Sequence, residues 1–383
     1  MRFSTSLAAM VVCMLVLAPF SNPEATDSEN KLMSEPVMKT DASNLSGWLA
    51  SAGGSSAERV QAMLSLPNGS MIVAGMFEQT IEFYGDVIGY SSNDSSFGID
   101  FFVAWIDENG TWTETLSASS SGLDGIDGMA RLSDGTLVMA GTFCGMTKGD
   151  ACNLTLAGLD PLNKSNDDDD NAVFLAAMSP TGGWMWATSF SNNYQMSVMD
   201  FLITPNDEVH LAVLHRDTLM SGDDVAPGSL SEDTLAVLVL DSNGNHMHMN
   251  TVFSSESLDG LGSLCMDYTG QTYLVTSFLD QINFGDHELT SFGGSHIAVG
   301  QYNSGGWLWA SGAGGTSDAS VADCDGRNDG GVAVVGDFMQ NLTFGDIEIG
   351  PSVWFDFYEA HIGSDGTWSV SYTHLRAHET PVN

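Results

Sequence analysis

The sequence predicts an all-β protein, a β-propeller of about five antiparallel blades with four or five strands each. A hydrophobic run that passes through a Gly turn to an aromatic residue returns along the chain, and a spacing of roughly sixty residues is typical of repeat architectures. Each unit contains short apolar runs bounded by Gly, Asn and Asp, which indicates strands. Beyond the N-terminus, no stretch of the sequence has the periodicity of an amphipathic helix.

The repeat is clearest at one aromatic position. The equivalent residues are Trp48, Trp112, Trp184, His246, Trp307 and Trp368. They divide residues 47–370 into units that span about 47–111, 112–183, 184–245, 246–306 and 307–367. Because the units cover most of the chain, we expect one repeat domain instead of the separate domains that the length alone would allow.

The first unit shows the expected strands in order. Its apolar runs are Trp48–Ser51, Ala62–Leu66, Met71–Phe77, Ile81–Ile88 and Phe101–Ile106. A Pro-Asn-Gly turn that ends at Gly69 separates the second run from the third and favours a hairpin. The third run returns in later units as Leu137–Phe143, Leu211–His215, Leu274–Phe278 and Val334–Phe338. It is apolar at successive positions, which predicts a middle strand covered on both faces.

A Phe-Gly-Asp turn also recurs. It occupies Phe284–Asp286 and Phe344–Asp346, and Phe83–Asp86 is the same turn with one insertion. Together with Gly-x-Trp, V-x-G-x-F and the apolar strand that ends in Asp-x-x-Gly, it resembles the secreted β-propeller repeats of bacteria and archaea over residues 47–370. The resemblance implies a propeller fold and export. It also implies a cell-surface or exported binding module.

The N-terminus has the pattern of a secretory signal. Arg2 supplies a positive charge and Leu7–Leu17 is an apolar run, too short to span a membrane. We expect residues 1–25 to be a signal peptide cleaved at its end or at Ala18, and residues 26–46 to be a polar linker. The mature protein is therefore expected to be secreted or to lie at the cell surface, without membrane insertion.

The charge of the chain limits its partners. Ten Lys and Arg stand against 49 Asp and Glu, which gives a formal net charge of −39. Such a surface repels nucleic acid and anionic membranes, so neither is expected as a partner. Solubility in a salty or extracellular medium is the simpler explanation of the charge, and a cation-binding surface is the alternative.

Four cysteines follow the signal segment. Cys144 and Cys152 bracket a short polar loop, and an oxidising compartment predicts a disulfide between them. Cys265 and Cys324 occupy nearly equivalent places in adjacent units. For these two we expect buried free thiols in preference to a bridge.

The last residues depart from the repeat. Residues 371–383 include His374, Arg376 and His378 and resemble a translated sequencing adapter. We expect a non-native tail and a native protein with further blades. Large apolar side chains of the last unit would then lie near an exposed patch that favours self-association. They are Val334, Phe338, Phe355 and Phe357.

Aromatic and histidine pairs are the first candidate sites. The pairs Trp184/Trp186 and Trp307/Trp309 each share a strand face. They could stack on a sugar, but their recurrence in the repeat favours packing between blades. A pair of histidines, His246 and His248, occupies the same place in its unit. A packing pair is favoured over a metal site because no carboxylate or Cys nearby in the sequence completes one.

Acidic clusters are the second candidates. Asp323, Asp325 and Asp329 resemble part of a calcium loop, but the closing Glu is missing. The run Asp167–Asp170 could hold calcium loosely, although such runs are usually solvated. We therefore predict no metal or cofactor site, with loosely bound calcium as the alternative.

The sequence contains no nucleophile elbow, HExxH or P-loop motif. No catalytic residue is predicted, and an enzyme is the less favoured interpretation. The expected function is an exported, acidic, non-catalytic module that binds an extracellular protein or glycan. One alternative is a glycan hydrolase or lyase that uses Phe-Gly-Asp carboxylates at the channel mouth. A structural surface or adhesion repeat is another. A single cluster of acid, base and aromatic residues would favour the enzyme.

Overall fold

The computed structural model describes residues 48–83, 86–88, 98–146, 152–164, 171–192, 194, 196–229, 231, 234–256, 258 and 262–370. Two compact units are present, Met1–Ala50 and Ser51–Asn383, and all described strands lie in the second. Those residues form β-strands and no α-helix, so the all-β prediction is confirmed. None of them belongs to a helix able to cross a membrane. The predicted signal peptide, the linker, Asp167–Asp170 and the 371–383 tail lie outside this description.

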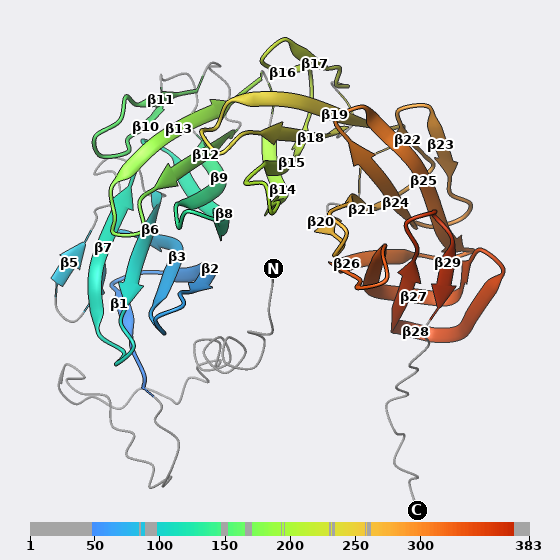
Figure 1. The fold of residues 1–383 in the computed structure, drawn as a ribbon, viewed down its shortest axis with the longest axis horizontal. Helices are drawn as coiled ribbons and strands as arrows, with labels where there is room; N and C mark the ends of the chain where they lie inside the picture. The colour runs from blue at the N-terminus through green and yellow to red at the C-terminus, as the bar shows by residue number, and fades with distance from the viewer. Residues whose placement is uncertain are drawn as a thin grey trace, which may run out of the picture. The chain divides into compact units, whose positions relative to one another are not determined.

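The described strands of Ser51–Asn383 form five antiparallel meanders of four strands each (Figure 1). The first contains β2 (Glu58–Ser65), β3 (Met71–Glu78), β6 (Ile99–Ile106) and β7 (Trp112–Ala118). The second contains β8 (Leu123–Arg131), β9 (Leu137–Gly145), β12 (Ala172–Met178) and β13 (Trp184–Phe190). The third contains β14 (Met196–Ile203), β15 (Val209–His215), β18 (Thr234–Leu240) and β19 (His246–Ser254).

The last two meanders repeat this order. The fourth contains β20 (Gly262–Met266), β21 (Thr272–Phe278), β24 (His296–Asn303) and β25 (Gly306–Gly315). The fifth contains β26 (Ala319–Gly326), β27 (Val332–Phe344), β28 (Ile347–Ile362) and β29 (Trp368–Val370). The sequence units and the sheets are offset by one strand. The strand that begins at the repeated Trp or His pairs with the strand before it, so it is the last strand of a meander although it begins a sequence unit.

Short hairpins lie between the second and third strands of the first four meanders. They are β4 (Ile81–Phe83) with β5 (Asp86–Ile88), β10 (Asn153–Leu154) with β11 (Leu162–Asn163), β16 (Leu219–Ser221) with β17 (Asp224–Ala226), and β22 (Gln281–Phe284) with β23 (His287–Thr290). In the fifth meander the hairpin continues β27 and β28. β22 pairs with β19 of the preceding meander, and β4 with β1 (Ala52–Gly54). The β22–β23 hairpin therefore joins the third and fourth meanders, and the hairpin part of β27 joins the fifth to β25 of the fourth.

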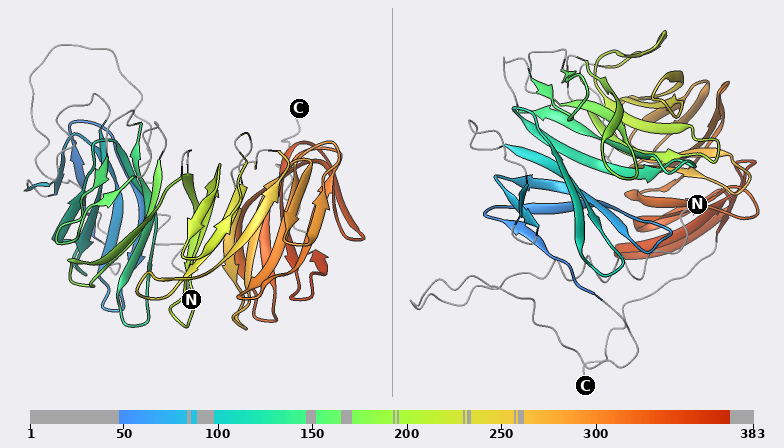
Figure 2. Two further views of the ribbon diagram at one scale, coloured as in Figure 1. Left: turned by 90° about the horizontal axis from the view of Figure 1, so that it is seen from above. Right: turned by 60° about the vertical axis from the view of Figure 1, so that its left-hand side comes forward.

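The hydrophobic core is divided among the contacts between successive meanders, which stand side by side in chain order (Figure 2). In β12, Phe174 and Ala176 pack toward the first meander, whereas Val173 and Leu175 pack toward the third. Alternate residues of one strand thus enter two cores. This explains why the middle strands are apolar at every position, as the sequence predicted.

Asp-x-x-Gly turns connect the third and fourth strands of the meanders. Asp107 Oδ1 accepts hydrogen bonds from the backbone N–H groups of Thr111 at 2.8 Å and Asn109 at 2.9 Å. These hydrogen bonds lower the pKa of Asp107, and the bond from Thr111 has the largest effect. Gly110 has a φ of 84°, which favours glycine. The Asp-x-x-Gly spacing, which is repeated along the chain, therefore serves the fold.

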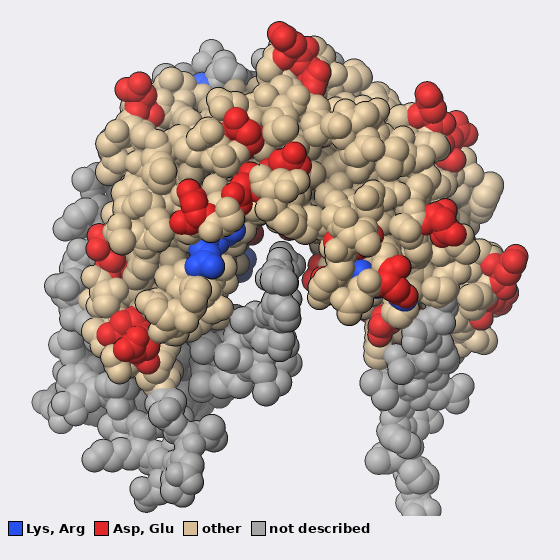
Figure 3. Space-filling model, viewed as in Figure 1, with Lys and Arg blue, Asp and Glu red and all other residues tan. Residues whose placement is uncertain are grey.

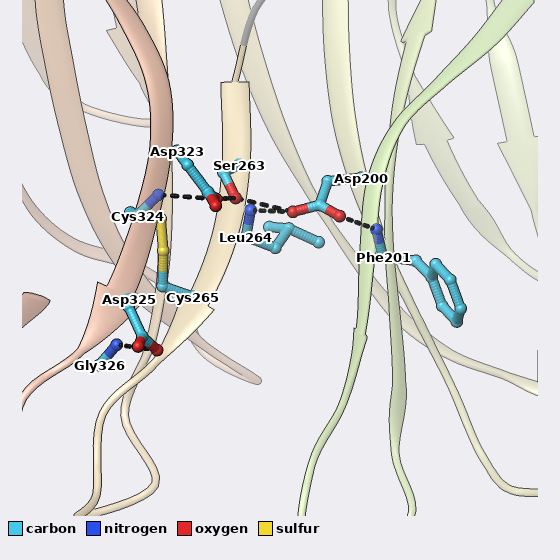
Figure 4. The surroundings of a disulfide bond; sticks show 9 residues. All are labelled: Asp200, Phe201, Ser263, Leu264, Cys265, Asp323, Cys324, Asp325 and Gly326. Carbon is cyan, nitrogen blue, oxygen red and sulfur yellow. Dashed lines mark hydrogen bonds between the residues drawn. A yellow bond between two sulfur atoms is a disulfide. The ribbon is translucent and has the colours of Figure 1, made fainter. Parts of the chain in front are cut away.

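The innermost strands of successive meanders lie next to one another, and a bonded series joins three of them (Figure 4). Ser263 Oγ of β20 lies 2.8 Å from Asp200 Oδ2 of β14 and 3.0 Å from Asp323 Oδ1 of β26. A disulfide joins Cys265 to Cys324, so the expectation of two free thiols is wrong. Nearly equivalent positions in adjacent units face each other here, with Cα atoms 6.0 Å apart. A second disulfide joins Cys144 to Cys152.

The fifth meander has one covered and one uncovered sheet face. Val334 and Phe338 are buried, but Phe355 and Phe357 are 64% and 47% exposed. The expected exposed patch therefore contains two of its four predicted residues, and Trp354 joins them. The buried pair faces the core shared with the fourth meander.

Candidate functional site

Three meanders pack two repeated aromatic residues against each other. In the fourth meander, Phe284 of the hairpin and Trp307 of β25 meet edge to face with ring centroids 4.8 Å apart. In the first, Phe83 and Trp112 meet in the same way at 4.7 Å. Phe344 contacts the Trp of β29 in the fifth meander. This pair fills the space between the hairpin and the last strand.

The third meander replaces both members of the pair. Ser221 stands at the Phe position of its hairpin and His246 stands at the Trp position of β19. Ser221 Oγ lies 2.8 Å from His246 Nδ1. His246 Nε2 lies 3.0 Å from Asp224 Oδ2. A packing contact has become a chain of hydrogen bonds, and we call these three residues the Ser221 site.

The β16–β17 hairpin positions two of the three residues. Ser221 and Asp224 are paired directly across it, so their side chains start from neighbouring backbone positions. Gly222 follows Ser221 with a φ of 58°, a conformation that favours glycine. A Cβ at Gly222 would lie 2.4 Å from His246 Cδ2. The turn therefore needs glycine both for its backbone and to admit the imidazole.

Burial differs along the Ser221 site. Ser221 is 5% exposed, the His246 side chain 16% and the Asp224 side chain 46%. A carboxylate has no proton to donate, so Asp224 accepts the hydrogen bond from His246 Nε2. Nδ1 then carries a lone pair, which accepts from the Ser221 hydroxyl. The two neighbours thus select one tautomer of the ring.

A pocket of about 200 Å³ opens beside Ser221 and His246. It lies between the last strand of the second meander and the hairpin of the third. Its lining is Thr188, Ser189, Phe190, Met220, Ser221, Gly222, Leu240, Gly244 and His246. Ser and His are smaller than Phe and Trp, so the replacement leaves space where the first, fourth and fifth meanders are filled by the aromatic pair. The lining of the pocket combines hydroxyl-bearing and apolar residues.

The tryptophan pairs bind neighbouring backbone segments. Trp307 Nε1 donates to the carbonyl oxygen of Thr251 at 2.8 Å. Trp186 Nε1 donates to the carbonyl of Ser242 at 3.2 Å. Both acceptors belong to other strands or turns, so each indole joins two parts of the fold. The geometry supports the packing interpretation of these pairs, since Trp186, Trp307 and Trp309 use their N–H groups within the protein and Trp184 is buried.

The predicted acidic candidates do not converge. Asp323 and Asp325 lie in β26, where their carboxylates accept the N–H groups of Cys324 and Gly326 at 2.8 Å each. Asp329 accepts from Arg327 Nε at 2.9 Å. The Phe-Gly-Asp carboxylates lie in the turns of hairpins that pair with the last strands, away from the innermost strands. Within the described residues no group of three metal ligands is found.

A buried pair of carboxyl groups lies near the Cys144 disulfide. Asp124 Oδ1 accepts from Ser120 Oγ at 2.6 Å and from the Cys144 N–H at 2.9 Å. Both carboxyl oxygens of Asp100 and the second oxygen of Asp124 meet no donor in the described part of the chain. Burial and then the charge of Asp124 raise the pKa of Asp100 to about 8. Burial raises the pKa of Asp124 to about 7. A proton held by the pair supplies the missing donor.

The sequence interpretation missed the Ser221 site. His246 was assigned to packing because no carboxylate lies beside it in the sequence. Asp224 and Ser221 reach it from the preceding hairpin, more than twenty positions away. The usable signal was that one unit replaces Phe and Trp together, at two positions that contact each other in other units.

Comparisons with known proteins find similar solved structures but no family. No protein-family model matches the chain, and no curated protein matches it. A solved protein of unknown function from Dyadobacter fermentans is similar at 10% identity and a TM-score of 0.40, over 82% of this chain and 93% of its own. The extracellular domain of a hybrid two-component system from B. thetaiotaomicron is similar at 8% identity and a TM-score of 0.15, over 76% of this chain and 57% of its own.

Proposed function

We propose that the chain is an exported β-propeller repeat protein that binds an extracellular glycan in the pocket beside the Ser221 site. Successive four-stranded meanders with cores between them support the propeller assignment. The Cys144–Cys152 and Cys265–Cys324 disulfides support an oxidising compartment outside the cytosol.

The single observation that carries the binding proposal is the paired replacement in the third meander. Residues shared by all units serve the fold, whereas Ser221 and His246 break the pattern and open a pocket. The lining includes two hydroxyl-bearing residues, Thr188 and Ser189, and the aromatic residue Phe190. Alternating polar and apolar walls suit a sugar, which has hydroxyls at its edge and C–H groups on its faces.

The size of the pocket limits the ligand. A volume of 200 Å³ is below the roughly 300–1,000 Å³ of ordinary small-molecule sites. One sugar ring or substituent therefore enters, and the rest of a glycan stays outside. The surface also excludes some partners, because the face in Figure 3 carries separate groups of Asp and Glu and few Lys or Arg. A neutral glycan avoids the repulsion that an anionic one would meet.

Ligand-observed NMR with a panel of neutral and O-acetylated monosaccharides tests this function. We expect saturation transfer to at least one neutral sugar, and loss of the signal in S221F/H246W, which refills the pocket with the aromatic pair of the repeat. Absence of transfer across the panel, or equal transfer to the refilled variant, would refute the proposal.

A further inference from the structure

The Ser221 site contains a hydroxyl, a base and an orienting carboxylate in one line. Asp224 holds the imidazole proton on Nε2 across 3.0 Å, and Nδ1 faces the Ser221 hydroxyl at 2.8 Å. A serine is a weak nucleophile until an adjacent base removes its proton. The known Ser-His-Asp triad places Ser on Nε2 and the carboxylate on Nδ1. Here the ring is reversed, and the three residues can take the same roles.

We propose that Ser221 is the nucleophile of a carboxylic-ester hydrolase that removes small acyl groups, such as acetyl, from an extracellular sugar. This activity rests on the proposed function, because the pocket that admits the sugar also exposes Ser221 and His246. The apolar residues Met220 and Leu240 are part of the lining of the same pocket, and apolar residues suit a short acyl chain.

The reaction balances with water as the only co-reactant. Ser221 Oγ forms a bond to the ester carbonyl carbon while its proton moves to His246 Nδ1. The bond from that carbon to the sugar oxygen breaks, and the proton passes from His246 to the departing hydroxyl. Water then attacks the acylated serine, again with His246 as base, and releases the carboxylic acid while Ser221 regains its proton.

The turn after Ser221 offers a group for the negative charge that forms on the carbonyl oxygen. The backbone N–H of the residue after a nucleophile often holds this charge. Here that residue is Gly222, and none of the backbone hydrogen bonds described for the turns uses its N–H. Its position in a tight hairpin turn, with a φ of 58°, keeps the N–H close to Ser221.

Packing alone does not account for this arrangement. A repeat that only needed to fill the space would keep Phe and Trp, as Phe284 and Trp307 do in the next meander. Burying the polar Ser221 costs free energy unless it is hydrogen-bonded. At the position of Asp224 the first meander has Asp86, the fourth has His287 and the fifth has Ile347. The first meander combines its carboxylate position with Phe83 and Trp112, whereas the third combines it with a serine and a histidine.

Covalent labelling of the purified exported protein with a fluorophosphonate tests the nucleophile directly. The reagent forms an Oγ–P bond and releases fluoride, and peptide mass spectrometry finds the modified residue. We expect modification of Ser221 and none in S221A. Label on other serines with Ser221 unmodified would overturn the proposal.

Hydrolysis of 4-nitrophenyl acetate tests the relay. We expect S221A and H246A to lower kcat/KM at least about 100-fold, as loss of a nucleophile or general base does. D224N should lower it less, by about 10-fold, because water screens a half-exposed carboxylate. The control H287A removes an imidazole from the equivalent hairpin of the fourth meander and should leave the rate unchanged. Equal rates in S221A and wild type, or an equal loss in H287A, would contradict the proposal.

The two proposals fail in different ways. If the protein binds sugars in the NMR panel but is not labelled and does not hydrolyse the ester, the binding proposal stands and the hydrolase proposal is refuted. If Ser221 is labelled but no sugar binds, the hydrolase proposal stands and the glycan assignment is refuted. The S221F/H246W variant serves as a folded control without the site, because it carries the aromatic pair that the repeat uses in other meanders.

Discussion

The hydroxyl of Ser221 lies 2.8 Å from Nδ1 of His246, at the two repeat positions where the next meander packs Phe284 against Trp307. Both members of a contacting pair have changed together, and Asp224 is hydrogen-bonded to the histidine that results. In a repeat protein, residues that the units share maintain the fold, and residues found in one unit alone are candidates for a function of that unit. The polar contact therefore sets the third meander apart from its neighbours.

Restoring the aromatic pair should stabilise the protein. In S221F/H246W, a buried Phe and an edge-to-face contact should raise the free energy of unfolding by about 1–3 kcal/mol. Asp224 is 46% exposed, so it can be hydrated after His246 is lost. Urea denaturation followed by fluorescence measures the change. A lower midpoint than wild type would show that the hydrogen-bonded chain stabilises the fold more than packing does.

The glycine after Ser221 should be less replaceable than its counterpart in the fifth meander. Gly222 and Gly345 have nearly the same φ, 58° and 57°. A Cβ at Gly345 meets nothing within 4 Å, but one at Gly222 would lie 2.4 Å from His246. We expect G345A to cost about 1 kcal/mol for the backbone alone, and G222A to cost at least about twice that. Equal losses in thermal denaturation would mean that His246 is not held against the turn.

The buried carboxyl pair should make the protein less stable as pH rises. The pKa of Asp100 is raised from 3.8 to about 8, so the folded protein keeps a proton that the unfolded chain releases. Its contribution is intact below about pH 4 and is lost as pH rises toward 8. D100N should remove the part of this slope that Asp100 contributes, and the burial of Asp124, which raises its pKa to about 7, should leave the remainder. Melting temperatures from pH 4 to 9 check this. An unchanged slope in D100N would contradict the assigned burial.

The two disulfides should stabilise unequally. Cys144 and Cys152 are 8 positions apart, whereas Cys265 and Cys324 are 59 apart. Closing the longer loop restricts the unfolded chain more, so C265A/C324A should cost about 4 kcal/mol and C144A/C152A about 2–3 kcal/mol. Mass spectrometry of unreduced peptides first verifies both bridges. Free thiols at either pair in the exported protein would show that the disulfide at that pair is absent and would contradict its predicted stabilisation.

Much of the fold follows from the sequence. The double-sided apolar pattern of Leu137–Phe143 predicts a middle strand covered on both faces, and this run lies in β9, where alternate residues enter two cores. Gly110 and Asp107 predict a turn, and the Asp side chain closes it. Local composition determines these features, because strand pairing with the nearest neighbour needs only a short turn.

Contacts between units were harder to predict. The Cys265–Cys324 bridge depends on two innermost strands lying side by side, and spacing along the chain does not reveal which faces meet. The same limit hid the Ser221 site, whose three residues come from a hairpin and a later strand. Aligning the units, and asking which positions contact each other across them, recovers both.

The protonation of one imidazole tests the central claim most directly. Long-range ¹H–¹⁵N correlation NMR on the purified protein reports which ring nitrogen of His246 carries the proton. At a pH where the ring is neutral, we predict the Nε2–H tautomer, with Nε2 donating to Asp224 and Nδ1 accepting from Ser221. In S221A the Nδ1 resonance should shift while Nε2 stays protonated, and in D224N the preference should weaken. An Nδ1–H tautomer, or a rapidly averaged ring in the wild type, would contradict the arrangement on which the site is built.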